Sequence, residues 1–170
     1  MHPHHDRARA RTGRRRGLRA VTTATALALG AALAVGPLAT PVGAAPTAPS
    51  RTTQEDEMAS KISGSRWLSG RSPLPFHDVM GDHASGWSGH MAWMNDLQHH
   101  PDLTSEANKI TTSWGGFAEI VGRGPSVAAV HDAFMRSPAH RDKIMGNWSW
   151  QGVGIVESGG QLWVTVRFLR

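Results

Sequence analysis

The chain has 170 residues and a formal net charge of +5, and it contains no cysteine, which excludes disulfide frameworks, thiolate metal sites and cysteine nucleophiles. The positive charge belongs to the N-terminal segment, because the residues from Pro46 onward carry 11 Lys and Arg against 12 Asp and Glu. With a net charge of −1 and no basic run, this larger part of the chain is not expected to bind nucleic acid.

Residues 1–44 have the pattern of a secretory signal peptide. Seven arginines precede the uncharged stretch AVTTATALALGAALAVGPLA, and the small residues Val42 to Ala44 fit the cleavage rule. A membrane anchor is the alternative, but the Thr and Gly content and the helix-breaking Pro37 and Pro41 disfavour a stable span. We therefore expect a secreted protein without a membrane span after cleavage. The export route stays open, since RRRGLR resembles a twin-arginine signal only loosely.

The part of the chain that follows the predicted signal peptide is large enough to form one domain with its own core. Residues 45–54 are small, polar and proline-containing, so they are expected to be a flexible lead to a domain that spans 55–170. Acidic residues followed by apolar residues four apart predict a first helix over 55–63. The segment SGRSPLPF is predicted to be a loop.

A second helix is predicted from 82 to about 97, because five apolar residues recur there at helical spacing and Asp82 can cap the start. Pro101 prevents the helix from continuing. His99 and His100 are therefore expected at or just beyond its C-terminal end, a place that also favours cationic side chains.

The middle of the chain gives weaker signals. NKITTSW is a possible short strand, and the glycine-punctuated GGFAEIVGRGPS is predicted to be a loop with a brief helical turn. A third helix is predicted over 126–135, where His131 is expected to be a structural residue. Ser137 and Pro138 predict a further short helix whose first turn holds His140. The helix dipole disfavours protonation of an imidazole at that position.

The end of the chain differs in kind. GVGIVESGGQLWVTVRF contains two β-rich runs joined through ESGG, which predicts a β-hairpin with a glycine turn. Helices first and a hairpin last predict an α+β domain in which helices pack on a small antiparallel sheet.

Four blocks in this order are MNDLQHHPDL, GGFAEIVGRG, VHDAFMRSPAHRDKIM and QGVGIVESGGQLWVTVRF. Together they resemble the CAP superfamily, the SCP-like extracellular domain of cysteine-rich secretory proteins, antigen 5 and pathogenesis-related proteins. The match is to the short bacterial branch and covers residues from about 57 to 170. The resemblance implies an α-β-α sandwich, with a small antiparallel sheet between helical layers.

The resemblance also implies a cleft lined by two histidines and one or two glutamates. HHPDL places the first histidine on His99, AEIVG places the glutamate on Glu119, and SPAHR places the second histidine on His140. The chain departs from the family pattern at the neighbours of these residues, which are Ala118, Ile120 and Ala139.

In eukaryotic members of the family, the resemblance implies a second acidic residue in this cleft. That residue should fall within 134–137, where this sequence has no acid. Two histidines and one carboxylate therefore remain of the family site.

Two neutral imidazoles and a carboxylate match the donor set of an open zinc site. Some family members bind divalent metal through these histidines, so the resemblance implies weak binding of Zn²⁺ or another divalent ion by His99 and His140. A cleft that works without metal is the alternative. The H-E-x-x-H spacing of metalloproteases is absent.

The preferred functional hypothesis is a non-catalytic binding module whose cleft holds a small ligand, a lipid or a cell-envelope component. The alternative is a hydrolase in which bound metal, or a His/Glu pair with Glu119 as candidate general base, activates water. GWSGH lacks the spacing of a nucleophile elbow, and no carboxylate pair flanks a clear cleft. The identity of the ligand and the oligomeric state stay open.

Overall fold

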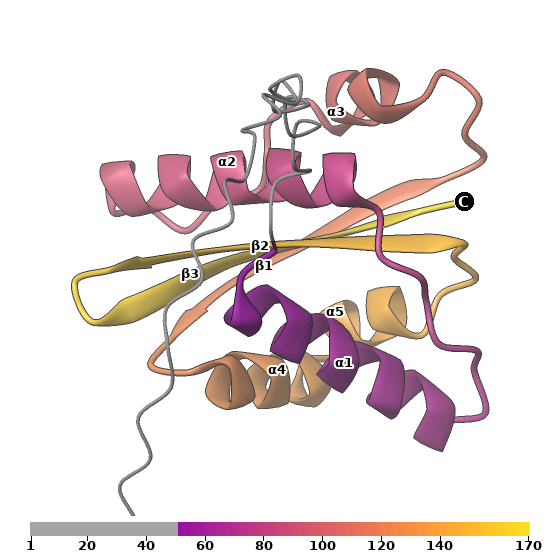
Figure 1. Ribbon diagram of the computed structural model, residues 1–170, viewed down its shortest axis with the longest axis horizontal. Helices are drawn as coiled ribbons and strands as arrows, with labels where there is room; N and C mark the ends of the chain where they lie inside the picture. The colour runs from indigo at the N-terminus through magenta and orange to yellow at the C-terminus, as the bar shows by residue number, and fades with distance from the viewer. Residues whose placement is uncertain (1–50) are drawn as a thin grey trace, which may run out of the picture. The chain divides into compact units, whose positions relative to one another are not determined.

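The computed structural model describes residues 51–170, which form a sheet between two layers of helices (Figure 1). The predicted signal peptide and the first part of the predicted lead lie outside the described residues. In chain order the elements are α1 (Thr53–Leu68), α2 (Asp78–Met94), α3 (Leu103–Ile110), β1 (Phe117–Gly124), α4 (Val127–Arg136), α5 (Pro138–Ile144), β2 (Trp150–Ser158) and β3 (Gln161–Leu169).

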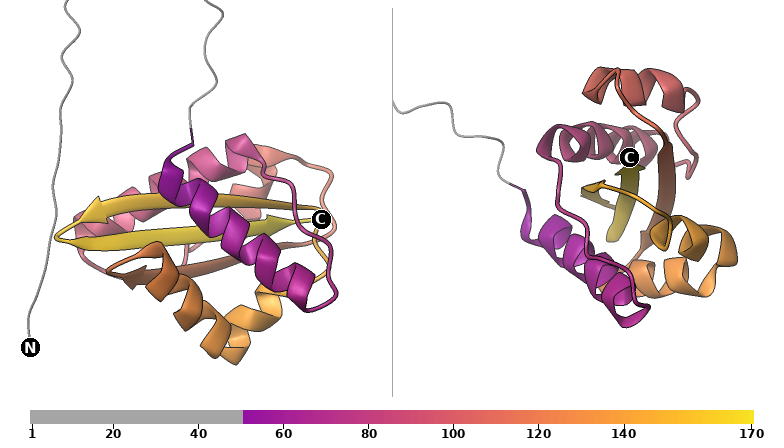
Figure 2. Two further views of the ribbon diagram at one scale, coloured as in Figure 1. Left: turned by 60° about the horizontal axis from the view of Figure 1, so that its bottom comes forward. Right: turned by 90° about the vertical axis from the view of Figure 1, so that its right-hand side faces the viewer.

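The three strands form an antiparallel sheet in the order β1-β3-β2, so the last strand of the chain is the central one. Helices α2 and α3 cover one face of the sheet, and α1, α4 and α5 cover the other (Figures 1 and 2). This arrangement confirms the predicted α+β class and the α-β-α sandwich. No helix in the described part of the chain is long and apolar enough to cross a bilayer.

The predicted hairpin is confirmed as β2 and β3. Its turn contains Gly159 and Gly160, both with positive φ, of 60° and 69°. Two successive residues in this conformation match the right-handed twist of the strands, and glycine adopts it without steric cost.

The two faces of the central strand serve different layers. Residues 162, 164, 166 and 168 face α1, α4 and α5 and belong to the larger hydrophobic core. Trp163 joins Met91 and Val121 in a smaller cluster on the side of α2. Thr165 and Arg167 alternate with the core residues in the same way as Trp163, so two polar side chains are buried between the sheet and the helices α2 and α3.

Helix α2 lies unusually close to strand β2. A Cβ atom at Gly154 would lie 1.9 Å from the backbone nitrogen of Ser85, and one at Gly152 would lie 2.8 Å from the backbone of Met80. The Ser88 hydroxyl lies 2.9 Å from the carbonyl oxygen of Gly154. Glycine is therefore required on β2 because the helix backbone occupies the space of a side chain.

Two of the predicted helices have different bounds in the structure. Helix α1 begins at Thr53, inside the predicted flexible lead, because Thr52 and Glu55 form a capping box. Helix α2 begins at Asp78, where the His77 side chain accepts from the backbone N–H of Met80. It ends at Met94, before the predicted end, because the chain turns into a left-handed conformation at the next residue.

The predictions for the middle of the chain were wrong in two places. The possible strand NKITTSW instead contributes the end of α3, a helix that begins after the Asp102 cap. The predicted loop GGFAEIVGRGPS contains strand β1. Its glycines are not chain breaks, since Cβ atoms at Gly122 and Gly124 would lie 2.7 Å from Phe134 and 2.9 Å from Val130.

The later helices agree with the predictions. Helix α4 begins after the Ser126 cap, and α5 has Pro138 in its first turn. Ser137 occupies the cap position of α5, but its side chain makes no capping hydrogen bond. His131 is buried between α4 and α1, where its Nε2 lies 3.0 Å from the Ser65 hydroxyl, as a structural residue would.

The contact between α2 and β2 gives a first testable prediction. Gly154→Ala should lower the free energy of unfolding by about 3 kcal/mol, because the added methyl group overlaps backbone that cannot move away. Gly64→Ala, in the interior of α1 with open space around it, is the control. It should raise the free energy of unfolding by about 0.5 kcal/mol, because alanine favours the helix. Urea denaturation measures both free energies of unfolding. Equal effects of the two substitutions would contradict the conclusion that the backbone of α2 fills the space beside Gly154.

Candidate functional site

The site is built around the carboxylate of Glu119, which lies on β1 and is only 1% exposed. Its Oε1 lies 3.2 Å from Nδ1 of His99 and accepts a 2.9 Å hydrogen bond from the backbone N–H of His100. Its Oε2 accepts a 3.0 Å hydrogen bond from Nε of Arg167. Both oxygens are therefore engaged by donors from other parts of the chain.

Local structure brings these groups together. Glu119 and Arg167 are directly opposite each other in the pairing of β1 with β3. After α2 ends at the left-handed Asn95, the chain turns back toward the sheet, and Trp87 Nε1 donates to the carbonyl oxygen of Gln98 at 3.0 Å. This anchor holds the segment that carries both histidines over the edge of β1.

The contact with Glu119 orients the imidazole of His99. A carboxylate only accepts hydrogen bonds, so Nδ1 of His99 carries the proton in this contact. In the neutral form of the ring, Nε2 then keeps its lone pair. The side chain is 52% exposed, so this nitrogen is available to a ligand from solvent.

His140 lies in the first turn of α5, with its ring edge-on to Phe134 at a centroid distance of 5.1 Å. Burial lowers the pKa of His140, and the positive charges of Lys143 and His99 lower it further. His140 therefore stays neutral to lower pH than an ordinary histidine. No hydrogen bond between described residues joins His140 to His99.

A hollow of about 250 Å³ lies beside His140, and we call it the His140 hollow. It runs along the edge strand β1, which α4, α5 and the segment after α2 enclose. Neither His99 nor Glu119 lines it, so only one of the three residues assigned from the sequence faces this space. Its lining consists of Leu97, Val121, Gly122, Arg123, Val130, Ala133, Phe134, Ser137 and His140.

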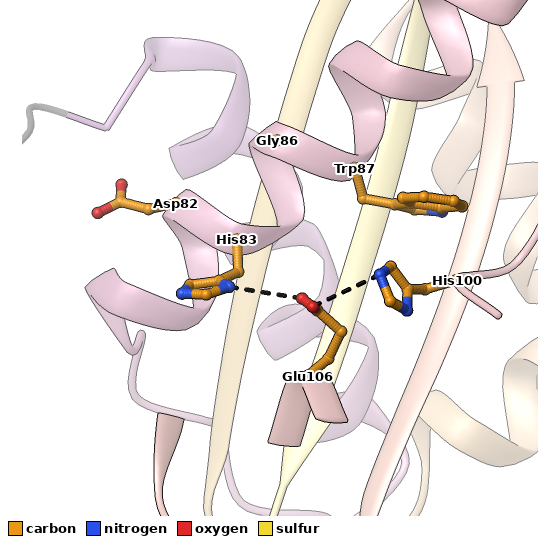
Figure 3. A pocket seen from close by; sticks show the side chains of 6 residues that line it. All are labelled: Asp82, His83, Gly86, Trp87, His100 and Glu106. Atoms are coloured by element: carbon orange, nitrogen blue, oxygen red, sulfur yellow. Dashed lines mark ion pairs between the residues drawn. The ribbon is translucent and has the colours of Figure 1, made fainter. Parts of the chain in front are cut away.

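A second hollow, of about 440 Å³, lies between α2 and α3 (Figure 3). His83 from α2 and His100 from the following segment point toward Glu106 on α3. His83 Nδ1 and His100 Nε2 each lie 3.4 Å from an oxygen of this carboxylate. Asp82, Gly86 and Trp87 complete the lining.

Glu106 is held as a buried anion by basic groups. Burial raises the pKa of this carboxyl. Hydrogen bonds from Lys109 and Arg167, together with the positive charges of Arg167 and His100, outweigh that effect and bring the pKa down to about 2. Lys109 Nζ lies 2.5 Å from one oxygen, and Arg167 Nη1 lies 2.6 Å from the other.

Arg167 joins the two carboxylates into one network. Its side chain is fully buried, with Nε on Glu119 and Nη1 on Glu106. Sequence reasoning assigned no role to Arg167 or Glu106. A signal did exist, because an arginine in a buried strand requires a carboxylate partner. The sequence did not show which carboxylates these are.

No group of three or more His, Cys, Asp and Glu side chains in residues 51–170 is arranged to hold a metal ion. The reason is visible in the contacts, since Glu119 and Glu106 already accept from nitrogen donors on both oxygens. Within the assigned site, two imidazoles are left as metal donors. Such a set is incomplete for a closed zinc site, which takes four protein ligands.

The lowered pKa of Glu106 predicts a dependence of stability on pH. A carboxyl with a folded pKa below its ordinary value stabilises the fold fully above about pH 4.5, and this contribution is lost as the pH falls toward 2. Glu106→Gln should therefore remove roughly 3 kcal/mol of the stability difference between pH 6 and pH 2.

Urea denaturation at a series of pH values measures this difference. Glu57→Gln is the matched control, because Glu57 makes only a surface pair with Lys61 at 3.8 Å, and its removal should change stability by less than about 0.5 kcal/mol. An acid dependence that is the same in Glu106→Gln as in the parent would show that this carboxylate is not held by its neighbours.

No protein-family model and no curated protein matches this chain. Solved structures do. An outer surface protein of Borrelia burgdorferi matches with 16% identity and a TM-score of 0.64, over 71% of this chain and 96% of that one. Venom allergen-like protein 4 of Schistosoma mansoni matches with 9% identity and a TM-score of 0.54, over 70% of this chain and 89% of that one.

An extracellular SCP-domain protein of Bacillus anthracis matches with 18% identity and a TM-score of 0.62, over 69% of this chain and 40% of that one. This chain therefore corresponds to less than half of that longer protein. At these identities the likeness concerns the fold. The fold that the four sequence blocks predicted is the one observed: the chain has the SCP-like fold of the CAP superfamily.

Proposed function

We propose that this chain is an exported, non-catalytic binding module, and that its ligands bind at the β1 edge of the sheet, on the side that carries His99 and His140. The observation that carries the proposal is the state of Glu119. This carboxylate is buried and engaged on both oxygens, so it serves to orient His99.

The same observation weighs against the hydrolase hypothesis. A general base must present a free lone pair to the proton that it abstracts. The Glu119 oxygens accept from the backbone of His100 and from Arg167, and the side chain is closed off from solvent. Its contacts support a positioning role.

We further propose that His99 and His140 bind a divalent metal ion weakly, with water molecules as the other ligands. Histidine ligands commonly donate their second ring N–H to a carboxylate, which fixes the tautomer and the ring orientation. The contact between His99 and Glu119 has this form. A bound ion would supply positive charge to attract an anionic group of a ligand.

Export is proposed from two independent observations. The N-terminal 44 residues have the composition of a secretory signal peptide. The solved structures with this fold include proteins described as extracellular, as outer surface proteins or as secretory.

Titration with zinc tests the metal-binding part of the proposal. Calorimetry of the parent should show weak binding, and His99→Ala or His140→Ala should each remove the measurable heat. Glu119→Gln should weaken binding about tenfold or more, because His99 loses the acceptor that fixes its tautomer.

His90→Ala is the control, since His90 is an exposed histidine on α2 that stacks on Trp87 but lines neither hollow. It should bind zinc as the parent does. An absence of zinc heat in the parent, or an equal loss in the control, would refute the metal site. Hydrolysis of casein or cell-wall material that Glu119→Ala abolishes would overturn the preference for a binding module.

A further inference from the structure

We propose that two adjoining hollows beside Phe76, at the β2 edge of the sheet, bind a small organic dication of the alkyl diamine class. This edge is opposite the β1 edge, to which the proposed function assigns its ligands. The inference goes beyond that function and uses none of its residues.

The two hollows share part of their walls. The first, of about 200 Å³, lies between the starts of α1 and α2 and the strand β2. The second, of about 220 Å³, lies between α1, the segment before α2 and the start of β2. Arg51 and Phe76 line both, so the two spaces adjoin at these side chains. We call them the Phe76 hollows.

Carboxylates dominate the charged groups of the Phe76 hollows. Among the lining residues, all of which belong to the described part of the chain, Arg51 is the only one with a positive charge. The carboxylates are those of Glu55, Asp56, Asp78 and Asp82. The hollows therefore carry an excess of negative charge, which attracts cations.

Glu55 is the buried member of this set, with 6% of its surface exposed. Its Oε1 accepts from the Ser85 hydroxyl at 2.7 Å and from the backbone N–H of Ile155 at 3.1 Å, and its Oε2 accepts from the backbone N–H of Thr52 at 2.8 Å. These donors are neutral, and no Lys or Arg of residues 51–170 pairs with this carboxylate. Hydrogen bonds without a counter-ion leave the charge of a buried carboxylate uncompensated.

The second hollow contains a buried acceptor that has no donor. Gln151 is 1% exposed, and its amide nitrogen donates to the carbonyl oxygen of Leu74 at 2.9 Å and to the hydroxyl oxygen of Ser63 at 3.1 Å. All three residues line this hollow. The amide oxygen of Gln151 has no hydrogen-bond partner among the described residues. Buried acceptors are rarely left unpaired, and an ammonium group bound in this hollow would supply the missing donor.

Arg51 marks the position that a cation takes here. Its guanidinium lies 4.3 Å from the centre of the Phe76 ring, its Nε lies 3.0 Å from Asp56, and its Nη1 lies 3.9 Å from Asp78. Asp78 lines the first hollow and Asp56 lines the second, so this side chain bridges the two. These ion pairs are partly exposed and therefore weak. A ligand with two ammonium groups would displace the guanidinium, because it brings one more positive charge.

The spread of the carboxylates favours an organic cation over a metal ion. No group of three or more His, Cys, Asp and Glu side chains in residues 51–170 is arranged to hold one ion, so a point charge would meet too few of these carboxylates at once. A diamine has two charges that are several bonds apart. Its methylene groups can lie against Phe76, Val153 and Ile155, which also line the first hollow.

The test is a calorimetric titration of butane-1,4-diamine into the purified protein, with NMR shifts of the α1 and β2 amides to locate binding. Butylamine, which has one charge, should bind at least about tenfold more weakly, because one charge-assisted contact is lost. Butane-1,4-diol, which has the chain without charge, should give no measurable heat. Calcium chloride at the same concentration should not displace the diamine, because the carboxylates do not converge on one point.

Substitutions in the lining should change the affinity in opposite directions. Asp78→Asn and Asp82→Asn each remove an exposed carboxylate and should weaken diamine binding about threefold. Arg51→Gln should instead strengthen it about threefold, because the diamine no longer has to displace a cation. Glu57→Gln removes an exposed carboxylate of α1 outside both hollows. It is the matched control and should bind the diamine as the parent does.

An undetectable affinity for butane-1,4-diamine would overturn this inference, as would butylamine that binds equally tightly or calcium that displaces the diamine. An equal loss of affinity in Glu57→Gln would also overturn it, because binding would then follow net charge alone. Weaker binding by Arg51→Gln would show that the ligand does not take the place of this side chain. Zinc binding at His99 and His140 is measured separately, so normal zinc heat in a protein that ignores the diamine would refute the diamine site alone.

Discussion

The structure depends on one buried cation. Arg167 lies on the central strand of the sheet, fully buried, and a guanidinium in that place requires carboxylate partners. Two of its nitrogens, Nε and Nη1, have such partners, whereas Nη2 has none among the described residues. Glu119 comes from the neighbouring strand β1, and Glu106 comes from α3. The three residues are 48 and 61 positions apart along the chain, so their pairing ties the edge strand and the outer helix to the centre of the sheet. Removing one partner would leave an uncompensated buried charge, so each carboxylate is needed where it stands.

The same network sets the chemistry of the surface. Glu119 meets Arg167 with one oxygen and the His99–His100 segment with the other, so the buried charge is connected to an exposed imidazole. Glu106 meets His100 from the other side, which fixes the segment between the two carboxylates. The histidine that faces solvent is therefore held by groups that never reach solvent. A binding surface gains selectivity from this kind of support, because its polar groups are oriented before a ligand arrives.

Local patterns predicted the parts of the fold that local interactions determine. The ESGG turn, the helix after Ser126 and the short helix after Pro138 all follow from residues within a few positions of each other. The family resemblance added the sandwich and pointed to His99 and Glu119, which are in contact. What could not be predicted rests on distant packing. Gly122 indicated a loop by itself, yet it is in a strand because Phe134 occupies the space beside it. Arg167 could be recognised as needing a partner, but nothing local identified Glu106 on a helix that itself was not predicted.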